Sequence, residues 1–118
     1  MKRILLADDD KNVNRSVDIL LTLDGYETMS VYNGEEALQK LLQQKFDLLI
    51  TDLIMPQLDG IELITRVRKF NNDLPIMVLS GQLNAKLIKL LKKKRIFHVL
   101  PKPINPVHFR KMIQKVFR

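Results

Sequence analysis

The stretch that decides the fold is Leu48-Leu49-Ile50-Thr51-Asp52-Leu53-Ile54-Met55-Pro56-Gln57-Leu58-Asp59-Gly60. It begins as a short apolar run followed at once by turn residues, which is typical of a strand buried on both faces of a parallel sheet. Asp52 then lies at the carboxyl edge of the sheet, where open α/β folds bind their ligands. The alternative is that Asp52 only caps its own loop, since aspartate is common in turns.

Strand-like and helix-like patterns alternate along the whole chain. Further strands are expected over residues 3–7, 26–31, 76–79 and 96–100, and the most polar of them, 26–31, is expected at an edge. The apolar positions expected to face inward on five helices are, in chain order, Val13, Val17, Leu20, Leu21; Ala37, Leu38, Leu41, Leu42; Ile61, Ile64, Val67; Leu83, Leu87, Leu90, Leu91; Phe109, Met112, Ile113 and Val116. This alternation predicts an α/β fold, a flavodoxin-like (βα)5 doubly wound, five-stranded parallel sheet with strand order 2-1-3-4-5.

Composition limits the class of protein. A chain of 118 residues is long enough for one sizeable core, so we expect residues 1–118 to form a single domain. The absence of cysteine excludes disulfides and thiolate metal sites, which fits a reducing compartment. The apolar run at the N-terminus meets Asp8 too early for a signal peptide or a membrane span, so we expect a soluble cytoplasmic protein.

Charge is divided unevenly along the chain. Residues 1–73 carry 13 acidic and 9 basic side chains, net −4, whereas residues 74–118 carry 11 basic side chains and no acidic one, net +11. Such asymmetry favours a partner of opposite charge for the second half. The alternative is a solvated basic surface that keeps the protein soluble.

The predicted sheet brings distant polar residues to one rim. Asp8 and Asp9 follow the first strand, Asp52 the third, Ser80 the fourth and Lys102 the fifth. Crowded carboxylates ionise comfortably only beside a cation, and Mg²⁺ suits a site with one or two carboxylates because it retains several waters. A carboxylate nucleophile, a hydroxyl group and a lysine at the same rim together indicate phosphoryl transfer to Asp52. For Asp8 and its neighbours the alternative is helix capping.

The chain resembles the receiver domain of two-component response regulators. The segments that carry the resemblance, in order and at the usual spacings, are Ile4-Leu5-Leu6-Ala7-Asp8-Asp9-Asp10, Asp52-Leu53-Ile54-Met55-Pro56-Gln57-Leu58-Asp59-Gly60, Leu79-Ser80-Gly81-Gln82 and Pro101-Lys102-Pro103. The resemblance implies that Asp52 accepts a phosphoryl group from a phosphohistidine of a sensor histidine kinase or histidine phosphotransfer protein. Such a domain is a regulatory phosphoacceptor and not an enzyme with a separate substrate.

The same resemblance assigns roles to the other residues of the rim. It implies that Asp9, Asp52 and the backbone carbonyl of Ile54 hold Mg²⁺, with Asp8 acting through water. Ser80 and Lys102 would bind the phosphoryl oxygens, and the peptide bond between Lys102 and the following proline would be cis.

Two positions depart from the family pattern. The family usually places Tyr or Phe three residues before the lysine, as a switch coupled to the Ser or Thr, and this chain has Val99 there. We expect the readout of phosphorylation to involve less aromatic movement, or to use Phe97 instead. The small Gly-Ala pair common before the last strand is replaced by Arg95-Ile96, which affects where that strand begins.

The resemblance also identifies an output face, formed by the fourth helix, the last strand and the last helix. The basic residues there are Lys86, Lys89, Lys92, Lys93, Lys94, Arg95, Arg110, Lys111, Lys115 and Arg118, and we expect no carboxylate to pair with them. A symmetric homodimer through this face would oppose like charges, so we expect a downstream protein with an acidic surface instead.

Two other functions are considered. A phosphorylation-independent binding module would retain the fold with Asp52 inactive. Nucleic-acid binding through the basic face is disfavoured, because no aromatic residues interleave the lysines to stack on bases. We expect no output domain after the last helix, so that the chain is either a stand-alone regulator, as a start at Met1 favours, or a receiver from a longer protein.

Overall fold

A parallel sheet of five strands forms the centre of the computed structural model, which describes residues 1–118. The elements, in chain order, are β1 (Arg3–Ala7), α1 (Lys11–Leu23), β2 (Glu27–Val31), α2 (Gly34–Gln43), β3 (Leu48–Thr51), α3 (Gly60–Phe70), β4 (Ile76–Ser80), α4 (Ala85–Lys93), β5 (His98–Pro101) and α5 (Pro106–Val116). The strand order β2-β1-β3-β4-β5 confirms the predicted topology, with β2 at an edge.

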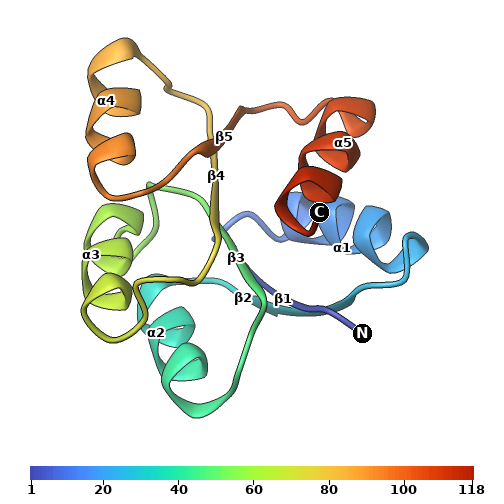
Figure 1. Ribbon diagram of the computed structural model, residues 1–118, viewed down its shortest axis with the longest axis horizontal. Coiled ribbons are helices and arrows are strands. Elements are labelled where there is room, and N and C mark those ends of the chain that lie inside the picture. The colour runs from blue at the N-terminus through green and yellow to red at the C-terminus, as the bar shows by residue number, and fades with distance from the viewer.

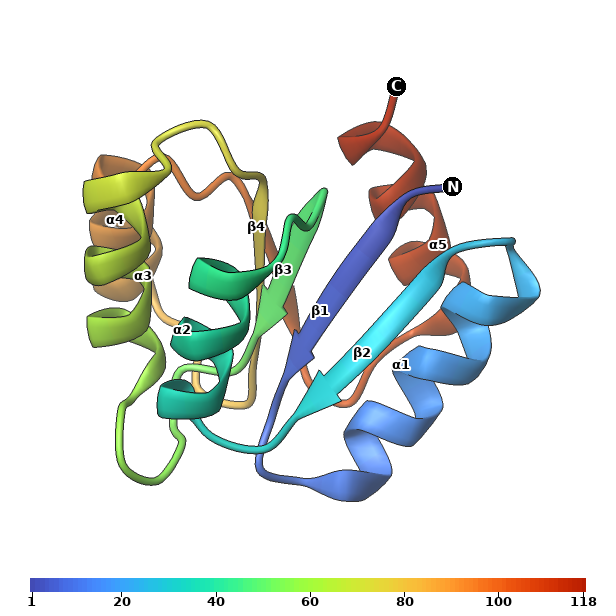
Figure 2. The ribbon, with the colours of Figure 1, turned by 90° about the horizontal axis from the view of Figure 1, so that it is seen from below.

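Helices cover both faces of the sheet. α1 and α5 lie on one face and α2, α3 and α4 on the other (Figures 1 and 2). The strands contribute side chains alternately to the two sides, so that Leu5 belongs to the core under α2, α3 and α4, and Leu6 to the core under α1 and α5. Burial on both faces explains why β1, β3 and β4 read as continuous apolar runs.

Every helix begins at a side chain that caps it. The N-cap residues are Asp10, Asn33, Asp59, Asn84 and Asn105, and each accepts a hydrogen bond from a backbone N–H in the first turn. Each cap contributes about 1 kcal/mol to stability. Because the caps come soon after the strands end, they set the length of the loops at the carboxyl edge.

Two expectations about packing were wrong, and the last strand begins later than expected. Leu42 and Leu90 are 63% and 40% exposed, because the buried stripe of each helix is narrower than its run of leucines. Phe97 is 66% exposed and precedes β5, which begins at His98. The left-handed backbone of Arg95, with φ of 63°, lets the chain turn after α4 and bury Ile96 instead.

None of the five helices combines the length and the apolar composition that a bilayer-spanning helix requires.

Candidate functional site

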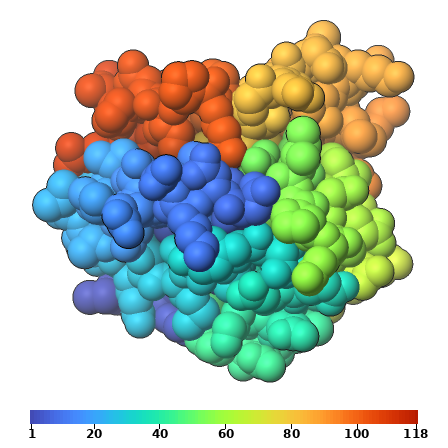
Figure 3. Space-filling view, turned by 180° about the vertical axis from the view of Figure 1, so that it is seen from behind, coloured from blue at the N-terminus to red at the C-terminus, as the bar shows by residue number.

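The polar residues predicted to converge lie together at the carboxyl edge of the sheet. Carboxylate oxygens of Asp8, Asp9 and Asp52 lie within 4.8 Å of one another. The Lys102 Nζ lies 2.7 Å from Asp8 Oδ2 and 2.8 Å from Asp52 Oδ2, although these acids are 94 and 50 residues away in sequence. In Figure 3 the blue, green and orange-red segments that carry these residues meet on one face of the molecule.

Parallel pairing of the strands aligns this rim. The backbone N–H of Asp52 donates to the carbonyl of Ala7 at 3.0 Å, continuing the register between β1 and β3. On the other side, the N–H of Lys102 donates to the carbonyl of Ser80 at 2.9 Å. The sheet itself therefore fixes the spacing between the acidic residues and the lysine.

The three aspartates of the acidic loop after β1 have different roles. Asp8 is 3% exposed, and its Oδ1 accepts from the N–H of Asp10 at 3.0 Å. Asp10 caps α1 by accepting from Asn12 N at 2.9 Å. Asp9 is exposed and accepts no hydrogen bond from the chain, so it remains available to a ligand. Capping therefore accounts for Asp10 alone.

Burial and pairing act in opposite directions on the charges of the site. Burial raises the pKa of Asp8, and the hydrogen bond from Lys102 offsets only part of that rise. Burial by itself would lower the pKa of Lys102, but its hydrogen bonds to Asp52 and Asp8 outweigh burial and raise it. The lysine is therefore held firmly in its cationic form between two carboxylates.

Asp52 is positioned by the turn that follows β3. Its Oδ1 accepts from the N–H of Leu53 at 2.6 Å, while its Oδ2 accepts from Lys102. The side chain is 12% exposed, so it can be reached from solvent. Gly60 closes the turn against it, because a Cβ at that position would lie 2.2 Å from the Asp52 carbonyl oxygen.

Sequence reasoning missed Asn14. This buried side chain donates from Nδ2 to the carbonyls of Asp8 and Val31, both at 3.1 Å, and so ties the acidic loop to the end of β2. A signal was present, since Asn14 is a polar residue in the buried stripe of α1 that includes Val17 and Leu21. Its role is to position the backbone of Asp8.

The remaining predicted residues lie around the acidic cluster. Ser80 is buried at the end of β4, and its hydroxyl oxygen accepts from Gln82 N at 3.2 Å. The peptide bond between Lys102 and Pro103 is cis, as the resemblance implied. Val99 packs half-buried against the core under α2, α3 and α4.

Two basic residues of the predicted output face have partners in the structure, which the sequence did not indicate. Arg110 is not unpaired, because it forms an ion pair with Asp24 after α1, at 2.5 Å from Nη2 to Oδ1. Lys94 Nζ donates to Thr65 on α3 at 3.0 Å. A basic groove of about 550 Å³ runs along α4. The residues that line it are Gln82, Asn84, Lys86, Leu87, Lys89, Leu90 and Lys93. A hollow separates α4 from α5 at this side of the molecule (Figure 3).

Comparison with known proteins agrees with this arrangement. The response regulator receiver domain family matches residues 4–114. The response regulator receiver protein CpdR of Brucella abortus is 37% identical over 116 residues, which cover 98% of this chain and 94% of that protein. Several other relatives match over 80 residues that make up 34% of their own length.

Solved structures share the fold over nearly the whole chain. The chemotaxis protein CheY4 of Vibrio cholerae superposes with a TM-score of 0.92 at 30% identity, covering 98% of both chains. The response regulator TrrA of Thermotoga maritima, solved in complex with Mg²⁺ and BeF, gives a TM-score of 0.87 at 31% identity, covering 98% of this chain and 99% of that one.

Proposed function

This chain belongs to the response regulator receiver domain family of two-component systems, and we propose that Asp52 is the residue that accepts its phosphoryl group. The observation that carries the proposal is the Lys102 ammonium, which lies 2.8 Å from the Asp52 carboxylate at the rim of the sheet. A half-buried cation beside a carboxylate that solvent can still reach is suited to balance the charge of a group transferred to that carboxylate.

The transfer is a displacement at phosphorus. An Asp52 carboxylate oxygen attacks the phosphorus of a phosphohistidine, a new P–O bond forms and the P–N bond breaks, so that the imidazole leaves and takes up a proton. The product is an acyl phosphate on Asp52. Lys102 pairs with the added negative charge, and the Ser80 hydroxyl, at the end of the neighbouring strand, donates to a phosphoryl oxygen.

The acidic cluster fits a divalent cation with oxygen ligands. Three carboxylates within 4.8 Å and a single lysine leave the pocket with net negative charge, and receiver domains bind Mg²⁺ at such a pocket. We assign Asp9, Asp52 and the carbonyl of Ile54 as its ligands, with Asp8 acting through water. Bound Mg²⁺ supplies positive charge that offsets repulsion between the carboxylates and the incoming phosphoryl group.

Partners follow from the family and from charge. The phosphoryl donor is a sensor histidine kinase or a histidine phosphotransfer protein, and residues 1–118 act as one receiver domain. Phosphorylation would alter the face formed by α4, β5 and α5 for a downstream protein with an acidic surface. The basic groove along α4 supports this choice of partner, and it disfavours a symmetric homodimer through the same face.

Intact-mass measurement after incubation with acetyl phosphate tests the proposal. We expect a single phosphoryl adduct on the wild-type chain with Mg²⁺, no adduct with EDTA, and none on Asp52→Asn. Asp59→Asn is the matched control, because this carboxylate caps α3 outside the cluster and asparagine also caps well.

The experiment also separates the rival functions. An adduct of equal size on Asp52→Asn would mean that another residue is the nucleophile. No adduct on the wild-type chain would favour a binding module that works without phosphorylation.

A further inference from the structure

A pocket separate from the acidic cluster lies at the amino edge of the sheet. It holds about 230 Å³ between the starts of β4 and β5, the C-terminal end of α3 and the segment after α4. The residues that line it are Arg68, Asn72, Asp73, Leu74, Pro75, Ile76, Arg95, Phe97 and His98. None of them has a role in the site at Asp52, so phosphorylation does not account for this pocket.

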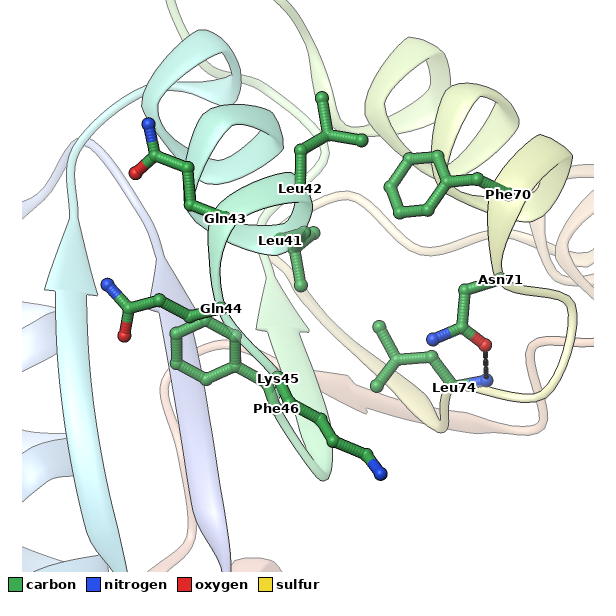
Figure 4. A pocket seen from close by; sticks show the side chains of 9 residues that line it. All are labelled: Leu41, Leu42, Gln43, Gln44, Lys45, Phe46, Phe70, Asn71 and Leu74. Atoms are coloured by element: carbon green, nitrogen blue, oxygen red, sulfur yellow. Dashed lines mark hydrogen bonds between the residues drawn. The ribbon is translucent and has the colours of Figure 1, made fainter.

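Backbone carbonyls fix Arg68 in the wall of the pocket. Its Nε donates to the carbonyl of Lys94 at 3.1 Å, and its Nη1 donates to those of Asn71 at 3.2 Å and Leu74 at 2.8 Å. The Asn71 side chain holds this turn in place by accepting from the N–H of Leu74 at 2.9 Å (dashed line in Figure 4). The two N–H groups of Nη2 have no partner in the chain, so they remain free to donate to a ligand.

The pocket carries positive charge that no carboxylate neutralises. Neither Arg68 nor Arg95 forms an ion pair, although the charge of Asp73 acts on Arg68. Burial lowers the pKa of Arg68, and the neighbouring charge of Arg95 lowers it further. His98 is neutral at pH 7 because burial lowers its pKa as well, so two arginines and one aspartate leave the pocket with a net charge of +1. Like charges held together in a partly buried place favour a bound ion of opposite charge.

Arg95 adopts a strained backbone conformation. The turn after α4 gives it a φ of 63°, in the left-handed region that glycine adopts readily and a residue with a Cβ does not. Receiver domains commonly carry a small Gly-Ala pair before the last strand, where this chain has Arg95 and Ile96. Burial of Ile96 explains the second replacement, whereas the Arg95 side chain is exposed and has no partner in the chain. Strain without an internal contact to compensate it indicates a ligand.

An exposed aromatic ring lines the same pocket. Phe97 is 66% exposed and belongs to neither hydrophobic core. Such a ring offers a flat surface on which a nucleobase can stack, whatever the base. Guanidinium groups suit a phosphate, because it accepts several charge-assisted hydrogen bonds from their planar fork. The pocket is smaller than the about 300–1,000 Å³ that encloses a whole small molecule, so the base would lie at its opening.

We propose that this pocket binds a nucleotide, with its phosphate between Arg68 and Arg95 and its base against Phe97. The free N–H groups of Arg68 Nη2 and the guanidinium of Arg95 would donate to phosphate oxygens. Asp73 opposes the charge of the phosphate, so we expect a modest dissociation constant, on the order of 100 μM. The site holds the nucleotide without making or breaking a bond.

An NMR titration of the intact chain with GMP in EDTA tests the proposal without any phosphoryl donor. We expect saturable shifts of the Arg68 Nε–H signal and of the backbone amides of residues 95–98, with little change at Asp8 and Asp52. Guanosine, which lacks the phosphate, and inorganic phosphate, which lacks the base, should each bind at least about tenfold more weakly than GMP.

Three results of this titration would overturn the proposal. They are the absence of a saturable shift at residues 95–98, shifts centred instead on the lysines of α4, and guanosine or inorganic phosphate binding as tightly as GMP. Each of them would leave the proposed function of Asp52 unaffected, because that function is measured by a phosphoryl adduct at the other edge of the sheet.

Arg95→Gly separates ligand binding from folding. It should weaken GMP binding at least about tenfold and yet raise the melting temperature, because glycine relieves the left-handed strain. Asp73→Asn should tighten GMP binding about threefold, since it removes the negative charge of the pocket. Lys89→Gln is the matched control, because it removes one positive charge from the exposed side of α4, and it should leave GMP binding unchanged.

The variants contradict the proposal in two ways. An Arg95→Gly chain that binds GMP as well as wild type, or that loses binding and also melts at a lower temperature, would mean that Arg95 is not a ligand-binding residue. A Lys89→Gln chain that loses as much affinity as Arg95→Gly would mean that general positive charge attracts the nucleotide, which would overturn the proposed site.

Discussion

Replacing Lys102 with methionine removes the one cation of the acidic cluster while keeping an unbranched side chain. The change deletes two charge-assisted hydrogen bonds, at 2.7 Å to Asp8 and 2.8 Å to Asp52, and leaves both carboxylates without a counter-charge. Breaking a buried ion pair by removing one partner costs about 3–5 kcal/mol. Because the lysine side chain is 21% exposed and that of Asp52 is 12% exposed, we expect the lower end, about 3 kcal/mol.

Urea unfolding followed by circular dichroism in EDTA measures this loss. A domain of this size has a free energy of unfolding of about 5–15 kcal/mol, so the variant should remain folded. Lys89→Met is the matched control, since Lys89 is exposed on α4 and has no ion-pair partner, and its free energy of unfolding should stay within about 0.5 kcal/mol of wild type.

Added Mg²⁺ extends the same experiment. The variant pocket has three carboxylates and no lysine, so it should bind the ion more tightly than wild type and gain more stability from it. A Lys102→Met chain that matches wild type within about 0.5 kcal/mol in EDTA would refute the reasoning, because the lysine would then not be needed to balance the acidic residues.

Three further predictions concern other parts of the chain. Burial, aided by the charge of nearby Lys115, lowers the pKa of His98 in the folded chain. The neutral His98 side chain therefore stabilises the fold above the unfolded pKa of about 6.5. This stabilisation is lost as the pH falls from there toward the lower pKa that His98 has in the folded chain. In urea titrations, the free energy of unfolding of His98→Gln should therefore fall less than that of wild type between about pH 7.5 and 5.5. Equal losses would mean that His98 does not cause the loss of stability at low pH. Gly60→Ala should lower stability by about 2 kcal/mol or more and impair phosphorylation of the intact chain, because the added Cβ would clash with the backbone of Asp52 and Leu53 directly after β3. Gly81→Ala has open space around its Cβ, and a similar loss there would contradict the steric explanation. Leu91→Ala should cost about 2–5 kcal/mol in chemical denaturation because Leu91 is fully buried, whereas Leu90→Ala should cost much less; equal costs would mean that the orientation of α4 is wrong.

The site could be predicted from sequence because parallel strands all end at the same edge. Once the apolar runs were assigned to strands, the residues after them had to converge, whatever their distance along the chain. This is why Asp8, Asp52 and Lys102 were found without knowledge of any contact. Their hydrogen bonds follow from strand register, which the hydrophobic pattern determines strongly.

The wrong predictions came from contacts that periodicity does not encode. Leucines at neighbouring positions all fit a helical stripe, and only the packing of α2 and α4 shows that Leu42 and Leu90 lie outside it. The pairing of Arg110 with Asp24 joins residues 86 positions apart through loop geometry. Asn14 could have been noticed as a polar residue at a buried position, but its two carbonyl partners depend on the path of the backbone.

Chemical trapping of the phosphorylated residue tests the central claim most directly. The chain is incubated with acetyl phosphate and Mg²⁺ and then treated with borohydride, which reduces an acyl phosphate to an alcohol, and its peptides are mapped by mass spectrometry. The account predicts homoserine at position 52 and at no other aspartate. Homoserine at Asp8 or Asp9, with position 52 unchanged, would contradict it.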